Sequence, residues 1–238
     1  MVKDHIAIIL ARGGSKRLPN KNILDFYSKP MIAWTIDAAI NSGQFFKVIV
    51  STDNQEIANI GIKYGAEVPF LRASGADDVT SSSEATIIAL KQATDYYGIR
   101  FRYVSQLMAN CPLRDEKVIE ASLDKFYNDS VESQISCFKY GFMNPWWALK
   151  KDTNGTYKKL FVDAHQQRSQ DLPDLYCPTG AIWTAKTDAL KRNKSFYTDN
   201  HTYFEISWKA GLDIDDQDDF DFAVATKISE ELKNNKKI

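Results

Sequence analysis

The amino-acid sequence predicts an α/β fold, built on a mostly parallel sheet with flanking helices. Short apolar segments alternate with amphipathic ones through the first half of the chain, as in repeated strand–helix–strand units. The first apolar segment, Ile6 to Leu10, opens directly into a basic loop that contains glycine, which is where open α/β sheets place their ligands. A length of 238 residues suffices for one such domain with a sizeable core.

The loop from Leu10 to Asn22, LARGGSKRLPNKN, predicts a phosphate-binding function. Its closely spaced cations suit a triphosphate: Arg12, Lys16, Arg17 and Lys21. We expect Gly13 and Gly14 to turn the backbone with positive φ and to let it approach the ligand. Ser15 adds a hydroxyl and Asn22 an amide. An ordinary turn is the alternative, and the spacing fits neither a P-loop nor a dinucleotide-binding motif.

Alternating patterns predict the next elements in order: a helix over 31–40 that ends near Ser42, a buried parallel strand over 47–51, a helix over 55–64 that stops at Gly65, and a strand over 67–71. The polar stretch 72–84 is expected to be a loop whose final serines cap a helix over 84–97. Capping alone and contact with a ligand are both open for these serines.

In the second half, the pattern predicts a central strand over 103–108, a helix over 115–127 and a strand over 131–139. The alternation then stops, and Asp152 to Gly155 indicates a hairpin turn. We interpret residues 1–238 as a single domain with a small β-rich excursion at about 140–180. Its adjacent Trp146 and Trp147 fit either packing or stacking on a ligand.

The segment Leu212 to Asp216, LDIDD, predicts a magnesium site. In an extended segment Asp213 and Asp215 lie on one side, with Ile214 facing the core. Two carboxylates that share a site with nucleotide phosphates are what Mg²⁺ prefers. The alternative is that an aspartate caps the last helix, predicted over 217–232, and both roles can hold at once.

Composition limits the remaining function classes. The chain has 30 basic and 31 acidic residues, so its net charge is −1, and no long basic run indicates a nucleic-acid partner. No leader pattern or long apolar run predicts membrane association, so we expect a cytoplasmic protein. Three widely spaced cysteines without a CxxC pair predict neither disulfides nor a zinc site.

The basic loop resembles the signature of the acylneuraminate cytidylyltransferases, the CMP-sialic acid synthetases, in which the first strand runs into Ala-Arg-x-x-Ser-Lys-x-Leu-Pro-x-Lys-Asn. The matching residues are Arg12, Ser15, Lys16, Leu18, Pro19, Lys21 and Asn22. Leu10 departs from the family, where a proline is common. The resemblance implies a Rossmann-like sheet of the nucleotide-diphospho-sugar transferase type. It also implies a homodimer, formed by the excursion, which lends residues to the neighbouring sugar pocket.

The same resemblance implies a reaction. CMP passes from CTP to the anomeric hydroxyl of a nine-carbon 2-keto sugar acid, sialic acid or a relative such as legionaminate, and pyrophosphate leaves. The catalytic residues implied are Arg12, Lys16, Lys21, Asp213 and Asp215, with Mg²⁺ on the two aspartates. The nucleotide-binding residues implied are Arg12, Gly13, Gly14, Ser15, Lys21, Asn22, Arg72 and Ser82.

The base and sugar pockets are where the sequence departs from the family. The stretch ending Pro112-Leu113-Arg114 resembles Gln-Pro-Thr-Ser-Pro-Leu-Arg, but Met108 stands in place of the glutamine, which helps to hold the nucleotide in the family. Gln106, two residues earlier, points the same way on a strand. The stretch 168–183 resembles Arg-Gln-x-Leu-Pro-x-x-Tyr-x-x-Asn-Gly-Ala-Ile-Tyr, with the arginine displaced by one residue. The sugar-binding residues implied are therefore Gln106, Arg168, Gln170, Tyr176 and Thr179, the last in place of an asparagine.

Three alternatives stay open. An arginine such as Arg168 suits the carboxylate of a sugar acid, but it also fits an exposed surface position. Enzymes that activate the eight-carbon octulosonate usually have Ser-Thr-Arg-Leu-Pro-Gly-Lys-Pro in the loop, so Ser15-Lys16 and Asn22 favour the nine-carbon acids. A non-catalytic nucleotide-binding protein on the same fold is a different class, because fold alone does not give function.

Overall fold

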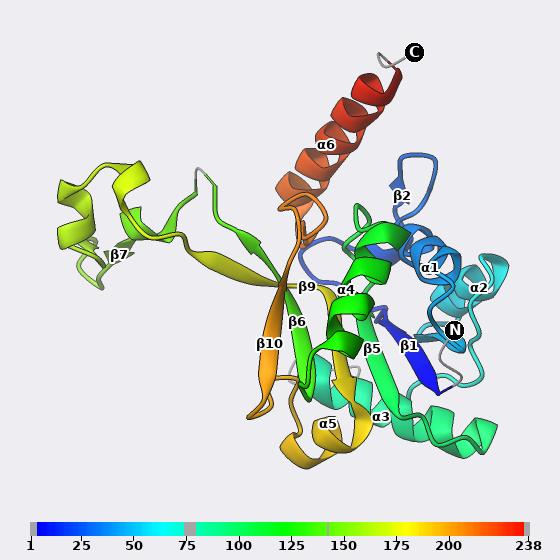
Figure 1. Ribbon diagram of the computed structural model, residues 1–238. Coiled ribbons are helices and arrows are strands. Elements are labelled where there is room, and N and C mark those ends of the chain that lie inside the picture. The colour runs from blue at the N-terminus through cyan, green and yellow to red at the C-terminus, as the bar shows by residue number, and fades with distance from the viewer. Residues whose placement is uncertain (1–3, 74–79, 142, 236–238) are drawn as a thin grey trace.

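A six-stranded sheet forms the centre of the protein (Figure 1). The computed structural model describes residues 4–73, 80–141 and 143–235. In spatial order the strands are β10 (His201–Glu205), β6 (Ser133–Lys139), β9 (Tyr176–Lys186), β5 (Tyr103–Met108), β1 (His5–Leu10) and β4 (Lys47–Ser51). β1 pairs in parallel with β4 and β5, and β10 with β6, while β9 runs antiparallel between β5 and β6. This confirms the mostly parallel sheet that the sequence predicts.

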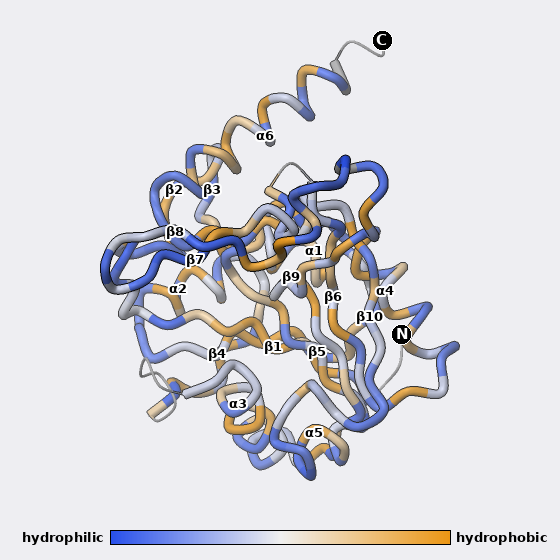
Figure 2. The backbone as a smooth tube through the Cα atoms, turned by 90° about the vertical axis from the view of Figure 1, so that its left-hand side faces the viewer, coloured by the Kyte–Doolittle hydropathy of each residue, from blue (hydrophilic) through white to orange (hydrophobic). Residues whose placement is uncertain are grey.

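Helices cover both faces of this sheet. α1 (Met31–Asn41), α2 (Gln55–Lys63) and α4 (Glu116–Asn128) share one apolar core cluster with the sheet, and α3 (Ser82–Tyr97) and α5 (Thr187–Asn193) share the other. Figure 2 shows α3 and α5 together on one side of the strands. β1 serves both clusters, since Ala7 and Ile9 face the first while Ile6 and Ile8 face the second. The strand that carries the basic loop is thus held from both sides.

The predicted strand over 67–71 is wrong. Only one bridge forms there, between Glu67 and Ile49 of the edge strand β4. Pro69 has no N–H to donate to a ladder, so the pairing does not extend beyond that bridge. The helix predicted over 84–97 starts earlier, at Ser82, because Ser81 caps it by accepting the Glu84 N–H at 3.2 Å. Residues 74–79 of the polar loop lie outside the described part.

Residues 140–141 and 143–175, here called the arm, project away from the sheet (Figure 1). The predicted hairpin forms there from β7 (Leu149–Lys151) and β8 (Tyr157–Lys159), and Gly155 turns with φ 82°. The short 3-10 helices of the arm are η2 (Pro145–Trp147), η3 (Asp163–Gln166) and η4 (Ser169–Asp171). Trp146 packs edge-on against Phe161 and donates to the Pro173 carbonyl at 2.9 Å, so its role in the fold is packing. Several large apolar side chains of the arm stay exposed: Met143, Trp147, Leu149, Tyr157, Leu160 and Val162.

The remaining elements frame the basic loop. η1 (Lys21–Ile23) and the small hairpin of β2 (Asp25–Phe26) and β3 (Lys29–Pro30) follow it. The last helix, α6 (Gln217–Asn235), extends outward from the sheet (Figure 1).

In the part of the chain that the structure describes, no helix is both long and apolar enough to cross a bilayer. The cysteines Cys111, Cys137 and Cys177 are all free thiols.

His5 is a fully buried titratable group in the central strand β1. One ring nitrogen is hydrogen-bonded to the Tyr127 hydroxyl, and the other lies 3.0 Å from the Ser105 hydroxyl. Burial lowers the pKa of His5 to about 3. His5 is therefore uncharged in the native state at neutral pH.

This buried imidazole predicts a pH-dependent stability. An unfolded histidine has a pKa of about 6.5, so between about pH 6.5 and 3 the unfolded chain binds the extra proton. The contribution of His5 to the free energy of unfolding is complete above pH 6.5 and falls by up to about 1.4 kcal/mol per pH unit below it. Urea titrations of the parent and of His5→Asn at pH 7.5, 6.5 and 5.5 measure it. The parent should lose more than the variant on acidification, whereas parallel losses would contradict the expectation.

Candidate active site

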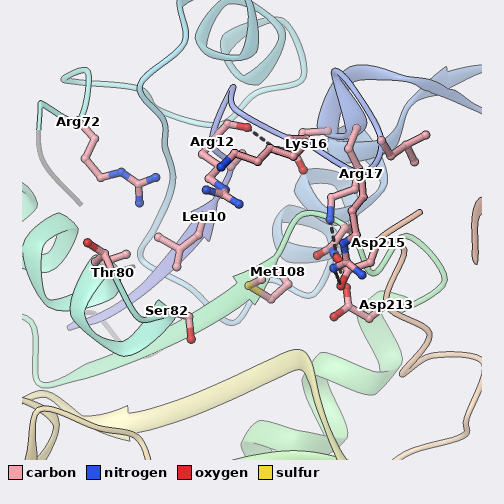
Figure 3. A pocket seen from close by; sticks show the side chains of 17 residues that line it. Leu10, Arg12, Lys16, Arg17, Arg72, Thr80, Ser82, Met108, Asp213 and Asp215 are labelled. Carbon is pink, nitrogen blue, oxygen red and sulfur yellow. Dashed lines mark hydrogen bonds and ion pairs between the residues drawn. The ribbon is translucent and has the colours of Figure 1, made fainter. Parts of the chain in front are cut away.

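A pocket of about 520 Å³ opens at the carboxyl ends of the inner strands β1 and β5 (Figure 3). In register, Leu10 at the end of β1 lies beside Met108 at the end of β5. The basic loop forms one side of the pocket, the start of α3 and Arg72 another, and the Asp213–Asp215 segment a third. Parts of the chain about two hundred residues apart in sequence therefore meet in one cavity of the size that holds a nucleotide.

The basic loop is tied down at both ends. Asn22 is buried and donates its side-chain amide to the Arg12 carbonyl at 3.0 Å. The Gly13 N–H donates to Asp53 at 2.9 Å, and a Cβ on Gly13 would lie 2.9 Å from the Asn54 amide nitrogen. Gly13 is therefore required by close approach to a neighbouring loop.

The predicted positive φ at Gly13 and Gly14 is wrong. Among the described residues of this loop, only Asn20 adopts positive φ, at 55°. Neither glycine lines the pocket, whereas Ser15 and Asn22 do. Gly13 supports the loop through its contacts, and the side chains of Arg12, Ser15 and Lys16 around the glycines face the cavity.

Five cations line the pocket: Arg12, Lys16, Arg17, Lys21 and Arg72. Lys21 donates to one oxygen of Asp215 at 2.8 Å, and the Arg17 guanidinium is hydrogen-bonded to the other. Arg72 is buried, and its backbone N–H donates to the Thr52 carbonyl at 2.7 Å. Such a concentration of cations beside two carboxylates suits a polyanion bound together with a metal ion.

The two aspartates are placed as the sequence predicts, because Ile214 between them is fully buried and anchors the segment. Part of Asp213 faces solvent, but burial of its carboxyl group and the charge of Asp215 raise its pKa to about 6. Burial acts in the same direction on Asp215, but Lys21 and Arg17 outweigh it and hold the pKa of Asp215 below its ordinary value. The two carboxylates thus repel each other when both are ionised, and a divalent cation bound between them would remove this repulsion.

The donor set tests whether a divalent cation fits. The described residues contain no group of three or more His, Cys, Asp or Glu that could hold a metal, so a cation here would complete its shell from phosphate oxygens and water. That arrangement is the one Mg²⁺ favours beside a nucleotide, and the site fits it. Capping occurs alongside, since Asp216 accepts the Asp219 N–H at 3.1 Å at the start of α6.

Ser82 and Arg72, which were predicted to bind the nucleotide, line the pocket. Gln106, which was predicted to bind the sugar, does not. Gln106 is fully buried, and its side-chain oxygen lies 3.0 Å from the Thr86 hydroxyl of α3. It shares a strand face with Met108 but lies one step deeper under the helix. Its predicted contact with a sugar is therefore not supported, and Met108 is the β5 side chain that reaches the cavity.

Met108 lies against Gly180 of β9. A Cβ on Gly180 would come within 2.6 Å of the Met108 Cγ, so this position needs glycine. Gly180→Ala is expected to lower the free energy of unfolding by about 1–3 kcal/mol, since overpacking forces side chains off their rotamers. Chemical denaturation measures the loss. Met108→Ala added to Gly180→Ala should restore part of it, and strictly additive losses would rule out this contact as the cause.

The other predicted sugar-binding residues do not meet at the pocket. Arg168 and Gln170 lie on the arm, where Arg168 is exposed and paired with Asp171 at 2.8 Å. Tyr176 is 44% exposed at the start of β9. Thr179 is buried, and its hydroxyl donates to the Gly211 carbonyl at 2.7 Å. Thr179 thus ties β9 to the segment just before the aspartates.

The structure adds pocket residues outside the predicted set. Asn110, two residues after the end of β5, lines the cavity, and so does Thr80 before α3. Arg17, counted in the loop as one cation among several, binds Asp215 directly. A lone asparagine after a strand has no periodicity to reveal it, and its partners lie about a hundred residues later in the chain.

Known proteins resemble this chain over almost its whole length. The family described as Cytidylyltransferase matches residues 6–203. A pseudaminic acid cytidylyltransferase of Campylobacter jejuni is 31% identical over 95% of this chain and 98% of its own. A CMP-N,N'-diacetyllegionaminic acid synthase of Legionella pneumophila is 32% identical over 94% of this chain and 96% of its own.

A solved structure shows the same fold. It is that of a CMP:2-keto-3-deoxy-manno-octonic acid synthetase complexed with CTP. The match has a TM-score of 0.69 and 17% sequence identity, and it covers 95% of this chain and 99% of that one. At this identity the likeness supports the architecture alone.

Proposed function

The chain belongs to the cytidylyltransferase family of CMP-nonulosonate synthetases, and from this premise we propose that it transfers the cytidylyl group of CTP to the anomeric hydroxyl of a nine-carbon 2-keto sugar acid. Family membership makes it a nucleotidyltransferase. The products are a CMP-sugar and pyrophosphate. Pseudaminic acid, a legionaminic acid and sialic acid are the acceptors to compare.

One observation carries the proposal: the cations of the basic loop and the two aspartates face one cavity. A triphosphate needs positive charge along its length, and its transfer chemistry needs a metal ion at the phosphate attacked. Paired carboxylates that can hold a metal ion beside the phosphates are what this chemistry requires. Lys21 and Arg17 pair with Asp215, so phosphate-binding cations adjoin the proposed metal ligands, which supports catalysis.

We assign Asp213 and Asp215 as the protein ligands of Mg²⁺. When bound, Mg²⁺ supplies Lewis-acid polarisation of the α-phosphate and helps to lower the pKa of the attacking hydroxyl. Arg12, Lys16 and Lys21 neutralise the β- and γ-phosphates and stabilise the departing pyrophosphate. The new bond joins the anomeric oxygen to the α-phosphorus, and the bond from that phosphorus to the bridging oxygen breaks. Nucleotide transfer asks little covalent chemistry of the protein, so positioning and charge dominate.

We assign the nucleoside end of CTP to the opposite side of the pocket. Arg72 and Ser82 lie there, with Thr80 and Leu10 beside them. A buried arginine and a hydroxyl at the start of α3 offer polar contacts, while Leu10 offers an apolar surface for a base. Ser15 and Asn22 support the phosphates between the two ends.

We further propose a homodimer in which the arm of one protomer completes the sugar pocket of the other. The exposed apolar side chains of the arm favour an interface, and neither Arg168 and Gln170 on the arm nor Tyr176 at the start of β9 lines the pocket of its own protomer. We place the protein in the cytoplasm, where CTP is made and where its free thiols stay reduced. Sedimentation of the parent and of Leu149→Glu tests the dimer.

Pyrophosphate release tests the activity directly. The protein is incubated with CTP and Mg²⁺ and with a panel of nine-carbon and eight-carbon keto acids. Release with a nine-carbon acid supports the proposal and identifies the sugar. Release only with the octulosonate would assign the eight-carbon reaction instead. CTP binding without release from any acid would leave a nucleotide-binding protein.

A further inference from the structure

Asn110 occupies a central position between the strand edge and the two aspartates. It lies two residues after the end of β5 and is 4% exposed. Its backbone carbonyl accepts the Ile214 N–H at 3.0 Å, and its side-chain Nδ2 donates to the Ile214 carbonyl at 3.0 Å. Asn110 therefore hydrogen-bonds both the N–H and the carbonyl of Ile214, the residue between the two aspartates.

The same amide also reaches both carboxylates. Nδ2 is hydrogen-bonded to Oδ1 of Asp213 and lies 3.4 Å from Oδ1 of Asp215. The segment that carries the aspartates has neither helix nor strand between Gly211 and the start of α6, so no backbone ladder fixes its side chains. The contacts with Asn110 supply that restraint on the side of β5, and Lys21 supplies it from the basic loop.

We propose that Asn110 is a positioning residue that holds the carboxylates of Asp213 and Asp215 in one orientation for a divalent cation. This rests on the proposed function, because it needs a cation at the pair. An amide N–H that bonds a ligating oxygen orients it without competing for the metal, and such supporting contacts typically contribute about 10- to 100-fold in metal affinity. In the resembling family element a threonine stands at this position, which keeps one donor where asparagine has two.

The alternative is a purely structural role, in which Asn110 only satisfies the buried backbone of Ile214. A structural role would change the free energy of unfolding and leave the folded protein's response to metal intact. A positioning role would weaken the coupling between metal and nucleotide. The two are separated by measuring how strongly Mn²⁺ improves CTP binding, in the absence of any sugar acid.

Equilibrium dialysis of labelled CTP against the full chain, in EDTA and in Mn²⁺, gives this enhancement. Asn110→Ala should reduce this enhancement about tenfold. The enhancement in Asn110→Thr should lie between the values for Asn110→Ala and the parent. Gln134→Ala is the matched control, because it removes a buried amide that donates to Ser122 at 2.7 Å outside the pocket. That control should lower stability and leave the enhancement as in the parent.

The possible outcomes distinguish a positioning role of Asn110 from a structural one. Parent-like enhancement in Asn110→Ala, at a temperature where the variant is folded, would overturn the inference and leave the proposed function intact. If Asn110→Ala does not fold, Asn110→Thr takes its place, and a parent-like value there would overturn the inference too. If the parent itself shows no enhancement by Mn²⁺, both the metal assignment and the inference fail. A graded loss from parent to Thr to Ala supports positioning.

Discussion

Replacing Asp213 and Asp215 together by asparagine is expected to lower kcat about a thousandfold, which corresponds to about 4 kcal/mol of transition-state stabilisation. The substitution keeps the shape of both side chains and removes both charges. Without the charges, a divalent cation loses its protein ligands beside the α-phosphate. Pyrophosphate release at saturating CTP and Mg²⁺ measures the effect. Chelation of the metal from the parent should abolish release, and added Mg²⁺ should restore it.

Asp218→Asn is the matched control for this pair. Asp218 is an exposed acid in the first turn of α6, only three residues beyond Asp215, and it does not line the pocket. Its removal should leave kcat as in the parent. Activity of the double asparagine variant within tenfold of the parent would contradict the metal assignment. Circular dichroism and thermal unfolding confirm that the variants being compared are folded.

Lys21→Met is expected to reduce kcat/KM about a hundredfold and, at the same time, to strengthen metal binding in the absence of CTP. Removing a preorganised charge from a developing anion typically costs this much. The second effect has a different origin, since Lys21 lies 2.8 Å from Asp215 and neutralises it in the nucleotide-free protein. A triphosphate that draws Lys21 toward itself frees Asp215 for the cation. Binding of CTP and of metal should therefore reinforce each other.

Titration of Mn²⁺ against the nucleotide-free protein tests the second effect. Mn²⁺ should bind several-fold more tightly to Lys21→Met than to the parent. Lys209→Met serves as control, because it removes a half-exposed ion pair with Glu230 that lies outside the pocket. Equal or weaker Mn²⁺ binding in Lys21→Met would show that Lys21 does not hold Asp215 in solution.

Sequence alone could predict the parts of the site that are local in the chain. The dense cations of the basic loop follow a strand, and the alternation of Asp213, Ile214 and Asp215 states which side chains face out. The burial of Ile214 follows from the same period of two. A capping serine was predicted before Glu84, and Ser81 does cap α3 by accepting the Glu84 N–H.

What the sequence could not predict depends on depth and on distant partners. Period two places Gln106 and Met108 on one face of β5, but only the packing of α3 decides which of them is covered. Asn110 acquires its contacts from Ile214, about a hundred residues later. The extended run after Glu67 has the composition of a strand, yet it lies outside β4 at the edge of the sheet and contains a proline. None of these facts is written in a local pattern.

The order of the strands in the sheet also bears on how the protein is made. β1 lies between β4 and β5, so the first strand to leave the ribosome gains its second neighbour only after about a hundred residues have been synthesised. The aspartates come later still, after every strand of the sheet. A nascent chain could thus assemble its sheet and basic loop before it holds either carboxylate. Catalytic competence would then appear only when the segment that carries Asp213 and Asp215 emerges, shortly after the last strand, β10.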